Sequence, residues 1–249
     1  MNTNATLDLL RKLKLKGMAD SYQAVIELPV NRHPAAHQLV AQLTHAEEQY
    51  RKSQKMKMFL RLSKLRYNAM LEEIHCTPTR NIQSEQLTLL ADCHFIDRAE
   101  NILITGATGC GKSHLACALG HQACMKGYRV LYLNLNRFIE KVNLSKLDGS
   151  YLKVLNQIEK IHLLVLDDFG LQPLDNPVKL GLLQILEDRY GRKSVIITSQ
   201  LPVNKWHEYL NEPTLADAIL DRLTANAHRF DLKGESLRKS KPIKTVTKQ

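Results

Sequence analysis

Residues 106–113 read Gly-Ala-Thr-Gly-Cys-Gly-Lys-Ser and match the spacing GxxxxGK[ST]. An apolar run, 101–105, precedes them, and a helical pattern, 112–126, follows. The glycines permit close backbone approaches, so the N–H groups can point at phosphate oxygens beside a helix N-terminus. The stretch predicts a phosphate-binding loop (P-loop) in which Lys112 reaches the β- and γ-phosphates and Ser113 holds Mg²⁺. The predicted nucleotide-binding residues are Gly106, Ala107, Thr108, Gly109, Cys110, Gly111, Lys112, Ser113 and His114.

A second signal is the stretch Leu-Leu-Val-Leu-Asp-Asp at 163–168, which is four apolar residues followed by two carboxylates. In a parallel sheet, ligands bind at the carboxyl ends of the strands. We therefore expect Asp167 to meet Mg²⁺ and Asp168 to polarise the attacking water. The alternative is a strand that ends in a solvated acidic turn, and the P-loop upstream favours the first interpretation.

Beyond residue 98 the pattern alternates between strand and helix, which predicts an α/β fold with a parallel sheet and helices on both faces. The expected strands are 101–105, 128–133, 162–167, 194–198 and 227–232, and the expected helices are 112–126, 136–144, 150–160, 177–190, 204–210 and 214–226. Helical patterns at 5–28 and 35–70 come first. The predicted organisation is a helical N-terminal module (1–75), a linker (76–98), the α/β core (99–232) and a basic C-terminal tail (233–249).

The charge of the chain favours polyanionic partners, because 35 Lys and Arg oppose 25 Asp and Glu, for a net charge of +10. Residues 51–66 contain seven basic residues and no acidic one. On a helix, Lys57, Arg61 and Lys64 share an arc of about 60° and become the candidate DNA contacts. A merely solvated basic surface is the alternative. No apolar run approaches the length of a membrane span, the N-terminus has no signal-peptide pattern, and five Cys without a CxxC pair suit a reducing compartment.

The segments GATGCGKS, LLVLDDFG and IITSQLP resemble those of AAA+ ATPases. Their order and spacing, together with AILDRL and GESLR, resemble more narrowly the IstB-like transposition helpers, which are relatives of DnaC-type helicase loaders. The resemblance covers nearly the whole chain. It implies a P-loop AAA+ core, preceded by a small all-helical module and carrying a reduced lid.

The resemblance also implies catalytic roles for Lys112 and Asp168 and for three further residues. Ser199 matches the sensor I region, with a register that is open by one residue toward Thr198 or Gln200. Arg222 in AILDRL matches the arginine finger, which acts on the nucleotide of a neighbouring subunit; an ion pair with Asp221 or Asp217 is the alternative. Arg238 in GESLR matches a second sensor or belongs to the basic tail.

Two further expectations concern the base and the rate of hydrolysis. Phe95 and Ile96, just before the first strand, either flank the adenine or pack in the core. Asp168 stands where many AAA+ proteins carry Glu, and the shorter side chain suggests slow hydrolysis of ATP to ADP and phosphate.

The implied function is an ATP- and Mg²⁺-dependent helper in the bacterial cytoplasm. It would self-assemble on double-stranded DNA as a homo-oligomer with active sites shared between subunits, without any membrane, and recruit or activate a partner transposase. Two alternatives stay open. One is a replicative helicase loader, which the N-terminal module should distinguish. The other is a nucleotide-gated DNA-binding scaffold with negligible turnover.

Overall fold

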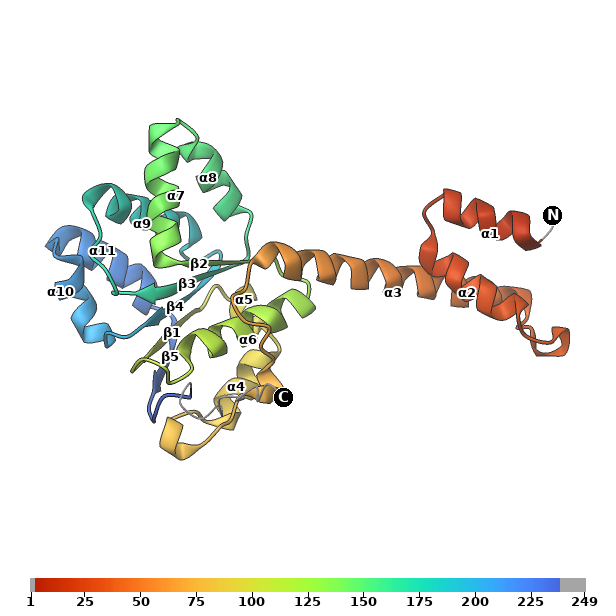
Figure 1. Cartoon of the computed structure of the whole chain (residues 1–249), viewed down its shortest axis with the longest axis horizontal. Coiled ribbons are helices and arrows are strands. Elements are labelled where there is room, and N and C mark those ends of the chain that lie inside the picture. Colours follow the sequence, from red (N-terminus) through yellow and green to blue (C-terminus); the bar gives the residue numbers. More distant parts are fainter. Residues whose placement is uncertain (1–2, 238–249) are drawn as a thin grey trace, which may run out of the picture. The chain divides into compact units, whose positions relative to one another are not determined.

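The computed structural model describes residues 3–237, and these divide into two compact units between Met58 and Phe59 (Figure 1). The first unit consists of α1 (Thr3–Lys12), α2 (Lys16–Ile26), the short 3₁₀ helix η1 (Val30–Arg32) and most of α3 (Ala36–Ser63). The helix predicted over 5–28 is interrupted, because Lys14 takes a left-handed conformation with φ = 60° and α2 starts afresh at Lys16. Neither Gly nor Pro marks this turn in the sequence.

Helices α2 and α3 contact each other closely within the first unit. A Cβ atom on Gly17 would lie 2.5 Å from the carbonyl oxygen of Ala46, so only glycine allows this approach. Glu47 is buried and accepts hydrogen bonds from the Met18 backbone N–H at 3.2 Å and from Arg51 Nε at 2.8 Å. These contacts hold the start of α2 against α3.

The second unit is built on a parallel sheet in the strand order β2-β3-β4-β1-β5. Its strands are β1 (Asn101–Gly106), β2 (Val130–Asn134), β3 (Leu163–Phe169), β4 (Ser194–Ser199) and β5 (Ala227–Leu232). All five lie within two or three residues of the predicted runs. The α/β fold with a parallel sheet is therefore confirmed.

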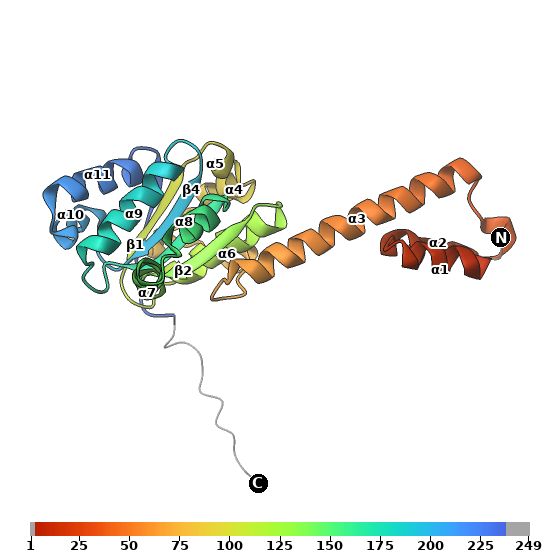
Figure 2. The same cartoon turned by 90° about the horizontal axis from the view of Figure 1, so that it is seen from above.

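Helices cover both faces of this sheet, as Figures 1 and 2 show. On one face lie α4 (Ser84–Ala91), α5 (His94–Asp97) and α6 (Lys112–Met125); on the other lie α7 (Leu135–Leu147), α8 (Tyr151–Glu159), α9 (Asn176–Arg189), α10 (Trp206–Leu210) and α11 (Pro213–Thr224). Strand β1 contributes side chains to the hydrophobic core on both faces of the sheet. Ile102 and Ile104 enter the core beneath α6, and Leu103 enters the core on the other face, as the two-residue period of a strand requires.

The boundary between the units differs from the predicted one near residue 75. The predicted linker, 76–98, forms η3 (Pro78–Arg80), α4 and α5, and its Leu87 and Leu90 are buried in the core beneath α6. Phe59 enters the same core. Burial of these apolar side chains attaches residues 59–98 to the second unit. Within residues 3–237, every helix is too short or too polar to cross a bilayer.

Candidate nucleotide-binding site

The P-loop connects the end of β1 to the start of α6, and its three glycines all have positive φ angles: 140° at Gly106, 85° at Gly109 and 100° at Gly111. A Cβ atom on Gly109 would lie 2.1 Å from Ser236 Oγ. Both the backbone conformation and the close approach of the chain after β5 therefore require glycine. The loop has the shape that the sequence motif predicts.

Lys112 is buried and turns its ammonium group back over the P-loop, where it donates to the carbonyl oxygens of Gly106 at 2.7 Å and Ala107 at 2.8 Å. Thr108 Oγ1 donates to Gln200 Oε1 at 2.8 Å. Cys110 is buried, and its carbonyl oxygen accepts a hydrogen bond from Arg80 Nη2 at 2.9 Å. The loop is thus tied to the end of β4 and to η3.

A cavity of about 730 Å³ opens in front of the P-loop, within the range of pockets that bind small molecules and cofactors. Its polar lining includes Thr108, Lys112, Ser113 and Asp168, and its apolar lining consists of Tyr67, Ile74, Ile82, Leu115, Leu171 and Leu237. His114 also lines the cavity, with its ring centroid 6.1 Å from that of Tyr67. A lining that combines polar and apolar side chains suits the phosphates and the base of a nucleotide.

Phe95 and Ile96, offered by the sequence either as adenine neighbours or as core residues, are core residues. Phe95 is fully buried and Ile96 is 4 % exposed, both beneath the sheet, and neither lines the cavity. The apolar lining of the cavity comes instead from Tyr67, Ile74 and Ile82 and from three leucines, Leu115, Leu171 and Leu237.

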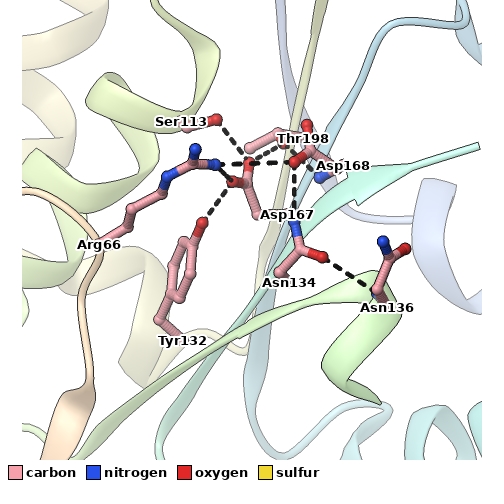
Figure 3. Close-up of polar contacts among 8 residues, drawn as sticks. All are labelled: Arg66, Ser113, Tyr132, Asn134, Asn136, Asp167, Asp168 and Thr198. Atoms are coloured by element: carbon pink, nitrogen blue, oxygen red, sulfur yellow. Dashed lines mark hydrogen bonds and ion pairs between the residues drawn. The ribbon is translucent and has the colours of Figure 1, made fainter. Parts of the chain in front are cut away.

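Asp167 and Asp168 reach the same site through an irregularity at the end of β3 (Figure 3). In a regular strand, successive side chains point to opposite faces. Here the register against β4 shifts between Leu166 and Phe169, and Asp168 has a φ of 64°. Its backbone N–H donates to Thr198 Oγ1 at 3.1 Å instead of to a strand carbonyl. The bulge therefore aims both carboxylates, the acidic pair, at the P-loop.

Asp167 is fully buried and lies within hydrogen-bonding reach of three hydroxyl groups. Ser113 Oγ donates to Asp167 Oδ1 at 2.8 Å, the Thr198 hydroxyl donates to the same oxygen, and the Tyr132 hydroxyl donates to Oδ2. Burial and the bond to Asp167 raise the pKa of Tyr132, so its hydroxyl keeps its proton. Hydroxyl and carboxylate oxygens are the ligands that Mg²⁺ takes in nucleotide sites, so Ser113 and Asp167 fit that ion.

Asp168 occupies a less buried position and accepts a hydrogen bond from Asn134 Nδ2 at 2.7 Å. Burial raises the pKa of Asp168, the neighbouring Asp167 raises it further, and Arg66 and Asn134 oppose the shift. A carboxylate with a raised pKa at the mouth of a phosphate site is suited to accept a proton from water.

The residue predicted as sensor I, Ser199, does not reach the site. Its hydroxyl donates to the Phe169 carbonyl at 2.6 Å and accepts from the Leu201 backbone N–H at 3.0 Å, away from the P-loop. The neighbours on either side, Thr198 and Gln200, contact Asp167 and Thr108 instead. Of the positions that the sequence left open, Thr198 and Gln200 therefore face the site and Ser199 does not, because alternate strand positions share a face.

Arg222 lies at the opposite end of β1 from the P-loop. Asn101, the first residue of β1, donates through Nδ2 to the Arg222 carbonyl at 3.0 Å. The Arg222 guanidinium pairs with Glu187 at 2.5 Å and lies 3.9 Å from Asp221, so the ion pair considered from the sequence exists but its closer partner is Glu187. A strand of this length separates Arg222 from its own P-loop by roughly 15–20 Å. Arg238 lies outside the described residues.

The three candidate DNA contacts do not form one helical stripe. Lys57 and Arg61 are exposed, one turn apart on α3. That helix ends at Ser63, and Lys64 follows in a left-handed conformation with φ = 56°. Lys64 lines a second cavity, of about 960 Å³, together with Arg137 and Lys141.

Four site residues went unnoticed in the sequence: Arg66, Arg80, Tyr132 and Asn134. Tyr132 and Asn134 occupy alternate positions at the end of β2, beside Val165 and Asp167 of β3, so strand alternation offered a signal for them. Arg66 and Arg80 reach the site only through the packing of residues 59–98 on the core, and no local pattern marks them.

Comparison with known proteins places these features in a family. The family model for IstB-like ATP binding proteins matches residues 8–245. The insertion sequence ATP-binding protein y4pL of Sinorhizobium fredii is 42% identical over 245 residues, which cover 98% of this chain and 100% of that protein. The ATP-binding protein of insertion sequence IS5376 from Geobacillus stearothermophilus is 30% identical, over 91% of this chain and 90% of that protein.

Among solved structures, the DnaC helicase loader matches with a TM-score of 0.55 and 23% identity, over 67% of this chain and 98% of that chain. AMPPCP-bound DnaA from Aquifex aeolicus matches with a TM-score of 0.58 and 20% identity, over 69% of this chain and 52% of that chain. These similarities show the P-loop AAA+ fold. Because the family model and the relatives span almost the full length, the chain belongs to the family of IstB-like ATP-binding proteins, and the relatives named here are ATP-binding proteins of insertion sequences.

Proposed function

We propose that this protein is an ATP-dependent, DNA-binding AAA+ helper of transposition that assembles on double-stranded DNA and recruits or activates a partner transposase. The observation that carries the proposal is the hydrogen bond between Ser113 Oγ and Asp167 Oδ1, at 2.8 Å, which joins the P-loop to the acidic pair beside the cavity. The insertion-sequence setting of the relatives supports transposition as the process in which the ATP is used.

In this proposal each residue of the site has a defined task. The P-loop N–H groups and Lys112 bind the phosphates, and Ser113 and Asp167 hold Mg²⁺. When bound, Mg²⁺ neutralises phosphate charge and fixes the orientation of the phosphate oxygens. Asp168 accepts a proton from water, and Gln200, tied to Thr108 of the P-loop, is placed to sense the phosphate end of the cavity.

The position of Arg222 supports a site shared between subunits. Arg222 lies beside the first residue of β1, whereas the P-loop of the same chain begins at the last residue of that strand. Arg222 lines a separate small cavity together with Lys193. A positive charge placed there acts on a nucleotide only if another subunit brings that nucleotide to it.

Magnesium-dependent ATP binding is the first test. Isothermal calorimetry should detect ATP uptake in the presence of Mg²⁺, and Lys112→Ala should weaken it by at least about tenfold, because the buried ammonium group that contacts phosphate is lost. Lys153→Ala, an exposed change on α8, is the matched control and should bind as the parent does. Equal binding by all three proteins would remove the basis of the proposal.

Turnover separates an ATPase from a nucleotide-gated scaffold. The rate of phosphate release should be measured with and without duplex DNA, for the parent and for Asp168→Asn. We expect DNA-stimulated release from the parent and little from the variant. If both proteins are equally inert and still assemble on DNA with ATP, the protein is a scaffold, and the ATPase assignment fails.

DNA binding should be sensitive to salt and insensitive to sequence, because it rests on phosphate contacts. Affinity for a random duplex should fall steeply between about 50 and 300 mM salt. The double change Lys57→Ala and Arg61→Ala should weaken it. Lys52→Ala on the same helix should not, since Lys52 is paired with Glu48 at 2.7 Å. Co-purification with a transposase would support the helper role, whereas a hexameric helicase in its place would indicate a loader.

A further inference from the structure

Arg66 projects into the site from the segment that follows α3 (Figure 3). Its Nη1 lies 3.9 Å from Asp167 Oδ2 and 3.8 Å from Asp168 Oδ2, so one guanidinium faces both members of the acidic pair. Its Cζ lies 5.3 Å from the centre of the Tyr67 ring, which supports the side chain from the adjacent position. Arg66 also lines the P-loop cavity.

The charges around the acidic pair give this contact its importance. Two adjacent carboxylates, one of them fully buried, repel each other and lose hydration. Their other close partners, the hydroxyls of Tyr132 and Ser113 and the amide of Asn134, are neutral. Lys112 is directed at P-loop carbonyls. Lys112 also attracts Asp168, but among the described residues Arg66 is the cation that forms ion pairs with both carboxylates.

A divalent cation on Asp167 competes with that guanidinium. Both are attracted by the same carboxylate, and each repels the other. Arg66 is 46% exposed, so its side chain has room to turn away. Asp167 is fully buried and accepts hydrogen bonds from three hydroxyl groups, so its side chain has no room to turn away. A cation bound to Asp167 would therefore act on Arg66, whose side chain can turn away, and not on the position of Asp167.

The backbone around Arg66 is fixed on both sides. Leu65 packs against Gly120 of α6, where a Cβ atom on the glycine would lie 2.8 Å from Leu65 Cδ2, and Ala69 is fully buried. Between them, Arg66, Tyr67 and Asn68 form a short exposed or half-buried stretch. Movement of the Arg66 side chain is thus confined to the connection between α3 and the sheet.

We propose that Arg66 is a positioning residue. It pairs with the acidic pair when Mg²⁺ is absent and releases it when Mg²⁺ and ATP bind, so that nucleotide binding changes the conformation of residues 66–68 between the two fixed positions. The proposal rests on the proposed function, because it takes Mg²⁺ and ATP as the ligands. It makes Arg66 a competitor of the metal rather than a ligand of the phosphates.

The competition can be measured with the single tryptophan of the chain. The Trp206 ring centroid lies 4.9 Å from that of Phe169, the residue that follows the acidic pair, so its fluorescence reports on the end of β3. Mg²⁺ is titrated at saturating ATP. In Arg66→Gln the half-saturating Mg²⁺ concentration should fall about two- to fivefold, as expected for loss of a half-exposed ion pair. Arg66→Lys should lie between this variant and the parent.

Arg137→Gln is the matched control, because Arg137 shares the second cavity with Arg66 and has no contact with the acidic pair among the described residues. It should titrate as the parent does. An unchanged or higher Mg²⁺ requirement in Arg66→Gln overturns the proposal, and a loss of ATP affinity at saturating Mg²⁺ makes Arg66 a phosphate ligand instead. If the parent itself binds no ATP, the proposed function fails, which is a different result.

Hydrogen exchange gives a readout that does not depend on turnover. In the parent, a non-hydrolysable ATP analogue with Mg²⁺ should change amide exchange at 66–68, and Arg66→Gln without nucleotide should already show part of that change. Arg137→Gln should behave as the parent. Identical exchange at 66–68 in the parent with and without the analogue contradicts the coupling.

Discussion

Asp168 combines a left-handed backbone, a hydrogen bond from Asn134 and a charged neighbour in one position. Non-glycine residues rarely adopt a φ near 64°, and Asn and Asp tolerate it better than others. The irregular backbone serves to bring the second carboxylate to the site. In this position burial and the neighbouring Asp167 raise the pKa of the Asp168 carboxyl group, so the ionised form is unfavourable in the folded protein.

This cost predicts that Asp168→Asn stabilises the fold. Because the folded-state pKa of Asp168 is raised, ionising it opposes folding at neutral pH, and this penalty disappears as the pH falls through that pKa. We expect the melting temperature at pH 7, measured without nucleotide, to rise by about 2–4 °C for each kcal/mol removed. The difference from the parent should shrink toward acidic pH. A lower melting temperature at pH 7 would contradict this account.

Individual site residues were predictable from the sequence where they belong to a motif. Residues that reach the site only through tertiary packing were missed. The spacing of the P-loop and the acidic strand end led to the pairing of Ser113 with Asp167. The register of the sensor position was open by one residue in the sequence, and the hydroxyl of Ser199 is bonded to the Phe169 carbonyl instead of to the site. Arg66 was seen only as one charge in a basic run, because its role depends on where the chain turns after Ser63.

Among the elements, η3 has a larger part than its three residues suggest. Arg80 at its end donates through Nη2 to the Cys110 carbonyl of the P-loop at 2.9 Å and through Nη1 to the His75 carbonyl at 3.2 Å. Its own carbonyl accepts from the Lys233 backbone N–H at 3.1 Å. Arg80 thus joins the P-loop, the lining of the cavity and the chain after β5.

We predict that Arg80→Met weakens nucleotide binding by about tenfold and destabilises the protein by about 1–3 kcal/mol, because two carbonyls lose a charged donor. Arg80→Lys should rescue little, since one ammonium group does not reproduce the planar fork. Calorimetry and denaturant unfolding measure the two effects. Arg98→Met, at a surface pair with Glu100, is the control and should change neither. Full nucleotide affinity in Arg80→Met would contradict the role.

The positions of the strands and of the helices that alternate with them were predictable because each βα unit repeats one hydrophobic pattern. Gly127 follows α6 and Gly191 follows α9, and both have a positive φ, which is common for a glycine just after a helix. The turn at Lys14 and the end of α3 at Ser63 were not predictable, since both occur in helix-forming sequence without Gly or Pro. Tertiary packing overrides local preference at these two places.

For the whole molecule, the separation of Arg222 from its own P-loop predicts complementation between two inactive variants. Lys112→Ala and Arg222→Ala should each lose ATP hydrolysis under assembling conditions. In an equimolar mixture, about one interface in four combines an intact Lys112 with an intact Arg222, so about a quarter of the parental rate should return. Phosphate release measures the rate.

The control mixture contains Lys112→Ala and a double variant that carries both Lys112→Ala and Arg222→Ala. Neither protein in this mixture has an intact P-loop. That mixture should stay inactive. Undiminished hydrolysis by Arg222→Ala alone, or no recovery in the first mixture, would mean that each site is completed within its own chain.

Strand β1 carries a consequence for communication around such an assembly. Its last residue, Gly106, opens the loop that would grip a subunit's own nucleotide, and the side chain of its first residue, Asn101, fastens the carbonyl of Arg222 and the backbone N–H of Val195. In the proposed assembly, this strand would connect the nucleotide site of one protomer to the Arg222 that the same protomer presents to its neighbour. A tilt of this strand on nucleotide binding would move Arg222 relative to the neighbouring nucleotide site. ATP hydrolysis in neighbouring protomers would then follow an order around the assembly.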